Sequence, residues 1–127
     1  EASISLEQVD YINTHGTSTP IGDVAAVKAI QDLFGKHAYN ISLTSSKSMM
    51  GHLLGGSGAV EAIISLLSMQ HSMVTPTINH EEGDEDPKID YKLNFTFNQA
   101  QSRDIHYAMS NNFGFGGHNA CLLFKKL

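Results

Sequence analysis

The sequence predicts an α/β domain with a mixed sheet, two main helices and the element order β-α-β-α-β-β. Two observations lead to this prediction. A short run of β-branched and aromatic residues, a turn rich in Gly, Ser or Thr, and a helical pattern follow one another twice, which is typical of parallel strand-helix-strand units. Near the end of the chain, two more apolar runs flank a glycine-rich segment, which predicts a hairpin.

The first unit begins with a predicted strand at residues 9–13, followed by a polar turn. A helix is predicted over residues 20–34, because Thr19 can serve as its N-cap and Pro20 suits the first helical position. Apolar residues recur at helical spacing along this segment, so one face should pack on the sheet. Gly35 is expected to end the helix.

The second unit begins with a predicted strand at residues 41–45. Its helix should run from about residue 53 or 56 to residue 70. This segment is apolar nearly all round, which predicts a helix buried on most sides. The glycines near its start lower helix propensity, and they make sense if another backbone or a ligand approaches closely there.

The last third of the chain contains shorter elements. They are predicted as an acidic solvated loop (81–86), a short strand (89–93) and two buried strands (105–110 and 120–124) around a glycine-rich loop (111–119). Cys121 falls within the final apolar strand, so we expect it to be an inert core residue.

The composition narrows the class of protein. A chain of 127 residues with 41% apolar residues suits one compact soluble domain. A formal net charge of −5 argues against nucleic acid or an anionic membrane as the main partner. No segment reads as a signal peptide or membrane span, and a single cysteine suits a reducing cytoplasm. Because the chain begins with Glu rather than Met, we expect a fragment or a trimmed chain.

Two histidines occupy equivalent places in the two units. His15 and His52 each follow a predicted strand and precede a helix, and such positions tend to hold ligand-binding groups in open parallel sheets. Neutral imidazole N–H groups there could stabilise a carbonyl oxygen that gains negative charge. The alternatives are two structural histidines bonded to turn backbone, or a metal site, although no third close ligand accompanies the pair.

Glu61 is the only charged residue between His52 and His71. An unpaired buried carboxylate is costly, so Glu61 should find a cation, and Lys47 at the end of the preceding strand is the nearest candidate. Alternatively, Glu61 lies at a helix edge and reaches water, and the spacing leaves both interpretations open. The loop at 114–117 lacks the Lys-Ser/Thr of a phosphate-binding loop, so no nucleotide site is expected.

Four stretches together carry a resemblance to a known family. They are residues 11–20 (YINTHGTSTP), 46–58 (SKSMMGHLLGGSG), 76–79 (PTIN) and 110–120 (SNNFGFGGHNA). In this order they resemble the C-terminal portion of the elongating β-ketoacyl-acyl-carrier-protein synthases (synthase II) of bacterial type II fatty acid synthesis, which have a thiolase-like fold. The resemblance extends over essentially the whole chain, so residues 1–127 are expected to form part of that C-terminal domain.

The resemblance implies a role for each of the candidate residues. His15 and His52 look like the paired catalytic histidines, which would bind the malonyl thioester carbonyl and stabilise the enolate formed on decarboxylation. Lys47 looks like the active-site lysine of the family, and Glu61 like its buried partner.

The resemblance also implies contacts with substrates and partners. Thr17 and Thr19 match threonines that contact the pantetheine arm, and Phe115 matches a gating phenylalanine whose N–H shares the acyl oxyanion hole. The expected partners are acyl carrier protein and, in the full-length enzyme, a second copy of the chain. No cofactor or metal is expected.

The nucleophile of the family is a cysteine in its N-terminal half, and no residue of this chain matches it. We therefore expect the chain to be an inactive fragment of a condensing enzyme when it is alone. The competing interpretations are a non-catalytic subunit similar to a chain-length factor, a fragment of a polyketide ketosynthase, and an independent metal hydrolase that uses His15 and His52. Retention of both histidines with Lys47 argues against a non-catalytic subunit.

Overall fold

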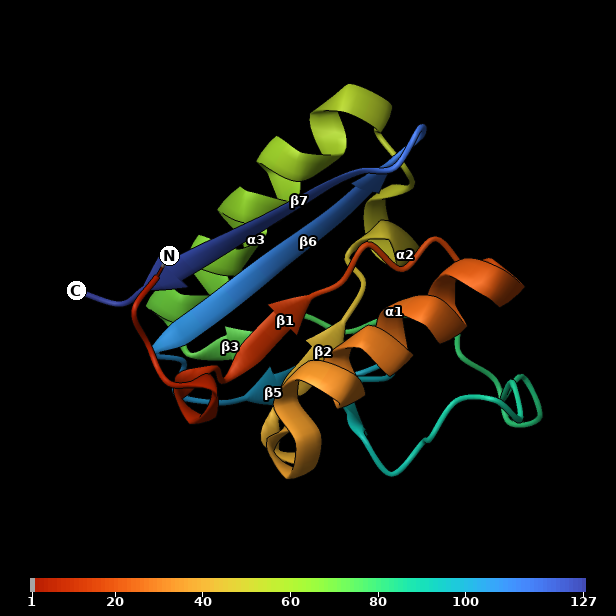
Figure 1. The fold of residues 1–127 in the computed structure, drawn as a ribbon, viewed down its shortest axis with the longest axis horizontal. Coiled ribbons are helices and arrows are strands. Elements are labelled where there is room, and N and C mark those ends of the chain that lie inside the picture. The colour runs from red at the N-terminus through yellow and green to blue at the C-terminus, as the bar shows by residue number, and fades with distance from the viewer. Residues whose placement is uncertain (1) are drawn as a thin grey trace.

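A five-stranded mixed sheet in the order β4-β2-β1-β6-β7 forms the centre of the computed structural model, which describes residues 2–127 (Figure 1). Its strands are β1 (Tyr11–Asn13), β2 (Ser42–Thr44), β4 (Asn94–Phe95), β6 (Tyr107–Gly114) and β7 (His118–Lys125). The helices are α1 (Pro20–Phe34), α2 (Lys47–Met50) and α3 (Ser57–His71), with 3-10 turns at η1 (Leu6–Gln8), η2 (Gly35–Asn40) and η3 (Leu54–Gly56). A second sheet pairs β3 (Met73–Val74) with β5 (Gln101–Ser102).

The register of the sheet determines where the functional edge lies. Strand β1 pairs in parallel with β2 on one side and with β6 on the other, so that Asn13 is opposite both Thr44 and Ser110. The carboxyl ends of these three strands therefore lie at one edge of the sheet. Strand β7 returns antiparallel to β6 through a short turn.

Two apolar clusters lie on opposite faces of the sheet because successive side chains of a strand alternate in direction. Ile12 of β1 belongs to a cluster with Ile30 and Phe34 of α1. Its neighbour Tyr11 belongs to a second cluster that includes Met69 of α3. The two long helices thus cover different faces of the sheet, with α1 over β1 and β2 and α3 beside β6 (Figure 1).

Several sequence predictions are confirmed. Helix α1 has the predicted bounds and ends at Gly35, whose φ of 53° lies in the left-handed region. The mixed sheet, the two main helices and the hairpin of β6 and β7 are present. No helix among the residues that the structure describes is long and apolar enough to cross a bilayer.

The strand predicted at residues 89–93 is wrong. These residues form turns, and the neighbouring strand β4 comprises only Asn94 and Phe95. The Asp90 carboxylate accepts a hydrogen bond from the Lys92 N–H at 3.0 Å, and the Leu93 N–H donates to the Asp90 carbonyl at 3.2 Å. Such local bonds offer the backbone an alternative to a strand ladder.

The predicted burial of the second helix is also wrong. Ile63, Leu66 and Leu67 of α3 are 46–56% exposed. The helix instead buries a stripe of four small or polar residues (Ser57, Glu61, Ser65 and Ser68) together with the apolar Met69. The small side chains of this stripe let α3 pack closely on β6. The apolar residues therefore lie on the opposite side of the helix, where the described part of the chain does not cover them.

The predicted burial of the final strand is wrong as well. Strand β7 is an edge strand whose residues are mostly exposed, and Cys121 is exposed rather than part of the core. Strand β6 continues to Gly114, so the predicted loop at 111–119 shrinks to a three-residue turn. Gly116 and Gly117 in this turn have φ values of 78° and 82°, which favour glycine.

Candidate active site

The two histidine-containing turns are joined directly at the carboxyl edge of the sheet. The Thr14 N–H donates to the Thr44 carbonyl at 2.8 Å, and the Thr14 hydroxyl donates to the same oxygen at 3.0 Å. The hydroxyl of Ser45 donates to the Gly16 carbonyl at 2.7 Å. The segment after β1 and the segment after β2 therefore hold each other in place.

Gly16 is required by this close approach. Its φ is 30°, and a Cβ atom at this position would lie 2.6 Å from the Cβ of Ser45. Any side chain would separate the two turns, so the glycine next to His15 permits the contact between them.

The structure brings the two predicted histidines together. The ring centroids of His15 and His52 lie 5.3 Å apart with an edge-to-face angle of 86°. The Phe113 ring from the end of β6 lies 5.6 Å from the His15 ring. Burial lowers the pKa of His15 below its usual 6.5, and the charges of Lys47 and His52 lower it further. His15 is therefore a neutral imidazole at pH 7.

His52 has a defined tautomer. The Leu54 N–H donates to Nδ1 of His52 at 3.0 Å, and a backbone N–H can only donate. The Nδ1 atom must therefore present its lone pair, which leaves the hydrogen of the neutral ring on Nε2. Leu54 adopts a φ of 51°, a conformation uncommon for a residue with a side chain, and this tight turn directs its N–H at the ring.

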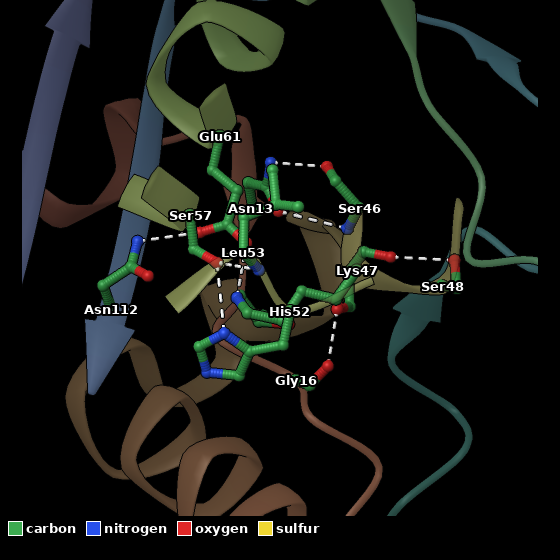
Figure 2. A network of polar contacts seen from close by, with 12 residues as sticks. Asn13, Gly16, Ser46, Lys47, Ser48, His52, Leu53, Ser57, Glu61 and Asn112 are labelled. Atoms are coloured by element: carbon green, nitrogen blue, oxygen red, sulfur yellow. Dashed lines mark hydrogen bonds and ion pairs between the residues drawn. The ribbon is translucent and has the colours of Figure 1, made fainter. Parts of the chain in front are cut away.

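Lys47 and Glu61 form a buried ion pair, which was one of the two interpretations of Glu61 that the sequence allowed. The Lys47 ammonium contacts Oε1 of Glu61, and the two side chains are 4% and 0% exposed. The side-chain amide of Asn112 donates to Oε2 of Glu61 at 2.8 Å, so both carboxylate oxygens are paired (Figure 2). The alternative that Glu61 reaches water at a helix edge is wrong.

Asn13 and Ser46 form a buried polar contact next to the lysine in the chain. The Asn13 amide donates to the Ser46 hydroxyl at 2.7 Å, and both residues are fully buried (Figure 2). This bond ties β1 to the residue that precedes Lys47. Asn13, Ser46 and Asn112 were not predicted as site residues from the sequence. A polar residue at the end of each apolar strand could have indicated them, because a buried amide or hydroxyl needs hydrogen-bond partners.

A cavity of about 730 Å³ opens beside these groups. Lys47 and His52 line one side of it, and Thr17 and Thr19 line another. The hydroxyl oxygens of Thr17 and Thr19 lie 3.3 Å apart, within hydrogen-bonding distance. Phe115 does not line this cavity, because it lies 98% exposed at the tip of the turn between β6 and β7. One imidazole, a buried ammonium and two hydroxyl-bearing residues therefore line this cavity, and the His15 ring lies behind that of His52 without lining the cavity itself.

Within residues 2–127, no group of three or more His, Cys, Asp or Glu side chains has an arrangement that could hold a metal ion. His15 and His52 therefore have no third ligand of these types among those residues.

Comparison with known proteins identifies the family. Residues 1–81 match the C-terminal domain of β-ketoacyl synthases. The chain belongs to this family. The match includes His15, Lys47, His52 and Glu61, whereas Phe115 lies outside it.

The relatives of the chain are longer than the chain itself. It is 52% identical over 126 residues to 3-oxoacyl-[acyl-carrier-protein] synthase 2 of Staphylococcus aureus (strain COL), and the alignment covers 99% of this chain and 30% of that protein. The chain therefore spans about 30% of the length of this curated relative.

Solved ketosynthase structures share the fold. A type II polyketide ketosynthase, solved in complex with its acyl-carrier protein and bound to a hexaketide, superposes with a TM-score of 0.92 at 33% identity, over 99% of this chain and 30% of that one. A β-ketoacyl synthase from Burkholderia phymatum STM815 gives 0.89 at 38% identity, over 99% and 29%. These similarities confirm the predicted thiolase-like fold class.

The buried ion pair gives a prediction about stability. Replacing Glu61 by Gln leaves the Lys47 ammonium buried without a counter-charge, so the fold should lose about 3–5 kcal/mol. The matched control is Asp32→Asn, which removes one partner of the exposed Lys28–Asp32 pair and should cost less than about 1 kcal/mol. Thermal unfolding of the three proteins measures both effects. Equal changes in Tm for the two variants would contradict the importance of the buried pair.

The environment of His15 gives a prediction about pH. Because the folded-state pKa of His15 is lowered from 6.5, the unfolded chain binds a proton that the folded chain does not. This contribution to stability is fully present above pH 6.5 and is lost as the pH falls through the folded pKa. An NMR titration of the His15 ring should give a midpoint below 6.5. A midpoint at or above that value would refute the assigned environment.

Proposed function

We propose that the chain is the C-terminal portion of a 3-oxoacyl-[acyl-carrier-protein] synthase, and that its residues handle the malonyl unit in a decarboxylative Claisen condensation. The observation that carries this proposal is the pair of imidazoles, 5.3 Å apart, beside a buried ammonium. Two imidazole N–H donors this close together suit an oxygen that gains negative charge during a reaction.

The proposed reaction begins with the malonyl thioester carbonyl hydrogen-bonded to His15 and to Nε2 of His52. The bond between the malonyl carboxylate and its neighbouring carbon breaks, carbon dioxide leaves, and the electron pair forms an enolate on the thioester. The two imidazole N–H groups stabilise the enolate oxygen. The enolate carbon then attacks the acyl-enzyme thioester, the thioester carbonyl of the malonyl-derived unit re-forms, and the thiolate of the nucleophilic cysteine leaves.

Lys47 supports this chemistry through its charge. Burial is the main cause of the lowered pKa of His15, and the Lys47 ammonium adds to it by disfavouring protonation of that ring. A neutral His15 can donate a hydrogen bond without carrying a charge that would need compensation in the ground state. Glu61 and Asn112 position Lys47 and keep its charge from being buried alone.

Other residues are proposed to bind the carrier arm and the acyl group. The Thr17 and Thr19 hydroxyls face the same cavity as His52, where they could bond the amides of a pantetheine chain. The Phe115 N–H is proposed to contribute to the acyl oxyanion hole, with its ring as a gate. The partner that delivers both substrates is acyl carrier protein, and the polyketide ketosynthase that superposes on this chain was solved with such a partner.

The nucleophilic cysteine is proposed to lie in the N-terminal part of the synthase, outside these residues. The uncovered apolar surface of this chain supports that proposal. Ile63 and Leu66 on α3 and Leu122 on β7 are 47–56% exposed, and their burial needs a further apolar surface. The N-terminal part of the synthase would cover them, and we propose that the complete enzyme is a homodimer.

A polyketide ketosynthase or a subunit similar to a chain-length factor is the alternative. The presence of His15, Lys47 and His52 together favours an active condensing enzyme, since a subunit without turnover has no need of all three. Between fatty acid and polyketide pathways, the 52% identity to a 3-oxoacyl-[acyl-carrier-protein] synthase favours the former.

A variant of His52 tests the proposed function in the complete protein. His52→Ala removes one of the two donors to the enolate oxygen, so malonyl decarboxylation should fall by about 10²–10³-fold. Acyl transfer to the cysteine should change far less, because it does not form this enolate. Carbon dioxide release measures the first step, and mass spectrometry of the acyl-enzyme measures the second.

The control for this experiment is His106→Ala, which alters a histidine whose ring is 65% exposed and pairs with Asp104. It should leave both steps unchanged. Equal loss of both steps in His52→Ala would contradict the assigned role. Absence of decarboxylation by the unmodified complete protein would favour the non-catalytic alternative.

A further inference from the structure

We propose that Ser57 is a positioning residue that fixes the orientation of the His52 ring. This inference rests on the proposed function, since it concerns the imidazole that would bind the malonyl carbonyl. Ser57 is the first residue of α3 and is fully buried. Figure 2 shows it between the carboxylate of Glu61 and the His52 ring.

The hydroxyl of Ser57 has one role as acceptor and one as donor. The Leu53 N–H donates to the hydroxyl oxygen at 2.9 Å. Nδ1 of His52 lies 3.2 Å from the same oxygen. Because Nδ1 already accepts the Leu54 N–H and presents its lone pair, the Ser57 hydroxyl must be the donor in this contact.

Nδ1 of His52 thus accepts from two donors, which share its single lone pair. The opposite tautomer would place a hydrogen on Nδ1 against the Leu54 N–H, so the Leu54 bond keeps the hydrogen on Nε2, where the enolate oxygen needs a donor. The Ser57 hydroxyl could bond either tautomer, and its contribution is therefore to the position of the ring. Together the two contacts limit rotation of the ring.

The position of Ser57 links the two halves of the site. Ser57 and Glu61 are four residues apart on the same buried side of α3. The first turns of one helix therefore set the orientation of His52 through Ser57 and the position of the Lys47 ammonium through Glu61. Leu53 is bonded to the same hydroxyl, so the turn that carries His52 is anchored to the helix start.

The decisive variant is Ser57→Ala in the complete synthase, since it removes one hydroxyl and adds no bulk. Loss of one hydrogen bond to Nδ1 should reduce kcat for malonyl decarboxylation by roughly fivefold, with KM for malonyl-carrier protein unchanged. The ¹⁵N NMR signal of His52 Nδ1 should move towards the position of a free unprotonated nitrogen, because Nδ1 loses one donor while the Leu54 N–H keeps the hydrogen on Nε2. A merely structural role of Ser57 would not move this signal.

The matched control is Ser65→Ala. Ser65 is a fully buried serine on the same side of α3, and its hydroxyl donates to the Glu61 carbonyl at 2.8 Å rather than to His52. This variant should leave both the Nδ1 signal and the decarboxylation rate unchanged. Equal effects of the two variants would overturn the proposal, because they would reflect the loss of any buried serine.

The outcomes also separate this inference from the proposed function. If Ser57→Ala leaves the Nδ1 signal and kcat unchanged while His52→Ala abolishes decarboxylation, the role of Ser57 is refuted and the function stands. If His52→Ala itself retains decarboxylation, the proposed function is refuted. A fall in kcat of Ser57→Ala with an unchanged Nδ1 signal would also refute the proposed hydrogen bond from Ser57 to His52.

Discussion

The buried contact between Lys47 and Glu61 is the interaction on which the site depends. Glu61 lies on α3, Lys47 begins α2 after strand β2, and Asn112 on β6 bonds the second carboxylate oxygen. One carboxylate therefore joins three elements that are distant in sequence. A buried charge without its partner destabilises the fold strongly, so this contact favours the arrangement in which the three elements meet.

The sheet supplies the second constraint. Parallel pairing of β1 with β2 and β6 brings the ends of three strands to one edge, and the bonds between Thr14 and Thr44 and between Ser45 and Gly16 close the gap between the turns. His15 is thereby held against His52, although 36 residues separate them along the chain. The Leu54 N–H and the Ser57 hydroxyl orient the His52 ring, and the His15 ring packs between it and Phe113.

Much of this could be predicted from the sequence, and the failures have physical causes. The caps of α1 and the repeated strand-turn-helix pattern are local signals, so helix bounds and the meeting of His15 with His52 could be predicted. Burial of α3 and β7 depends on what lies beside them, and hydrophobicity alone cannot specify which side is covered. Asn13, Asn112 and Ser57 were missed because a buried polar residue reveals its partners only after folding.

The central claim is that two neutral imidazoles converge on one carbonyl oxygen. A crystal structure of the complete protein with a malonyl thioester analogue that cannot lose carbon dioxide tests it most directly. The account predicts that the thioester oxygen lies about 2.7–3.2 Å from a ring nitrogen of His15 and from Nε2 of His52. A thioester oxygen bound elsewhere, with both imidazoles bonded only to protein groups, would contradict it.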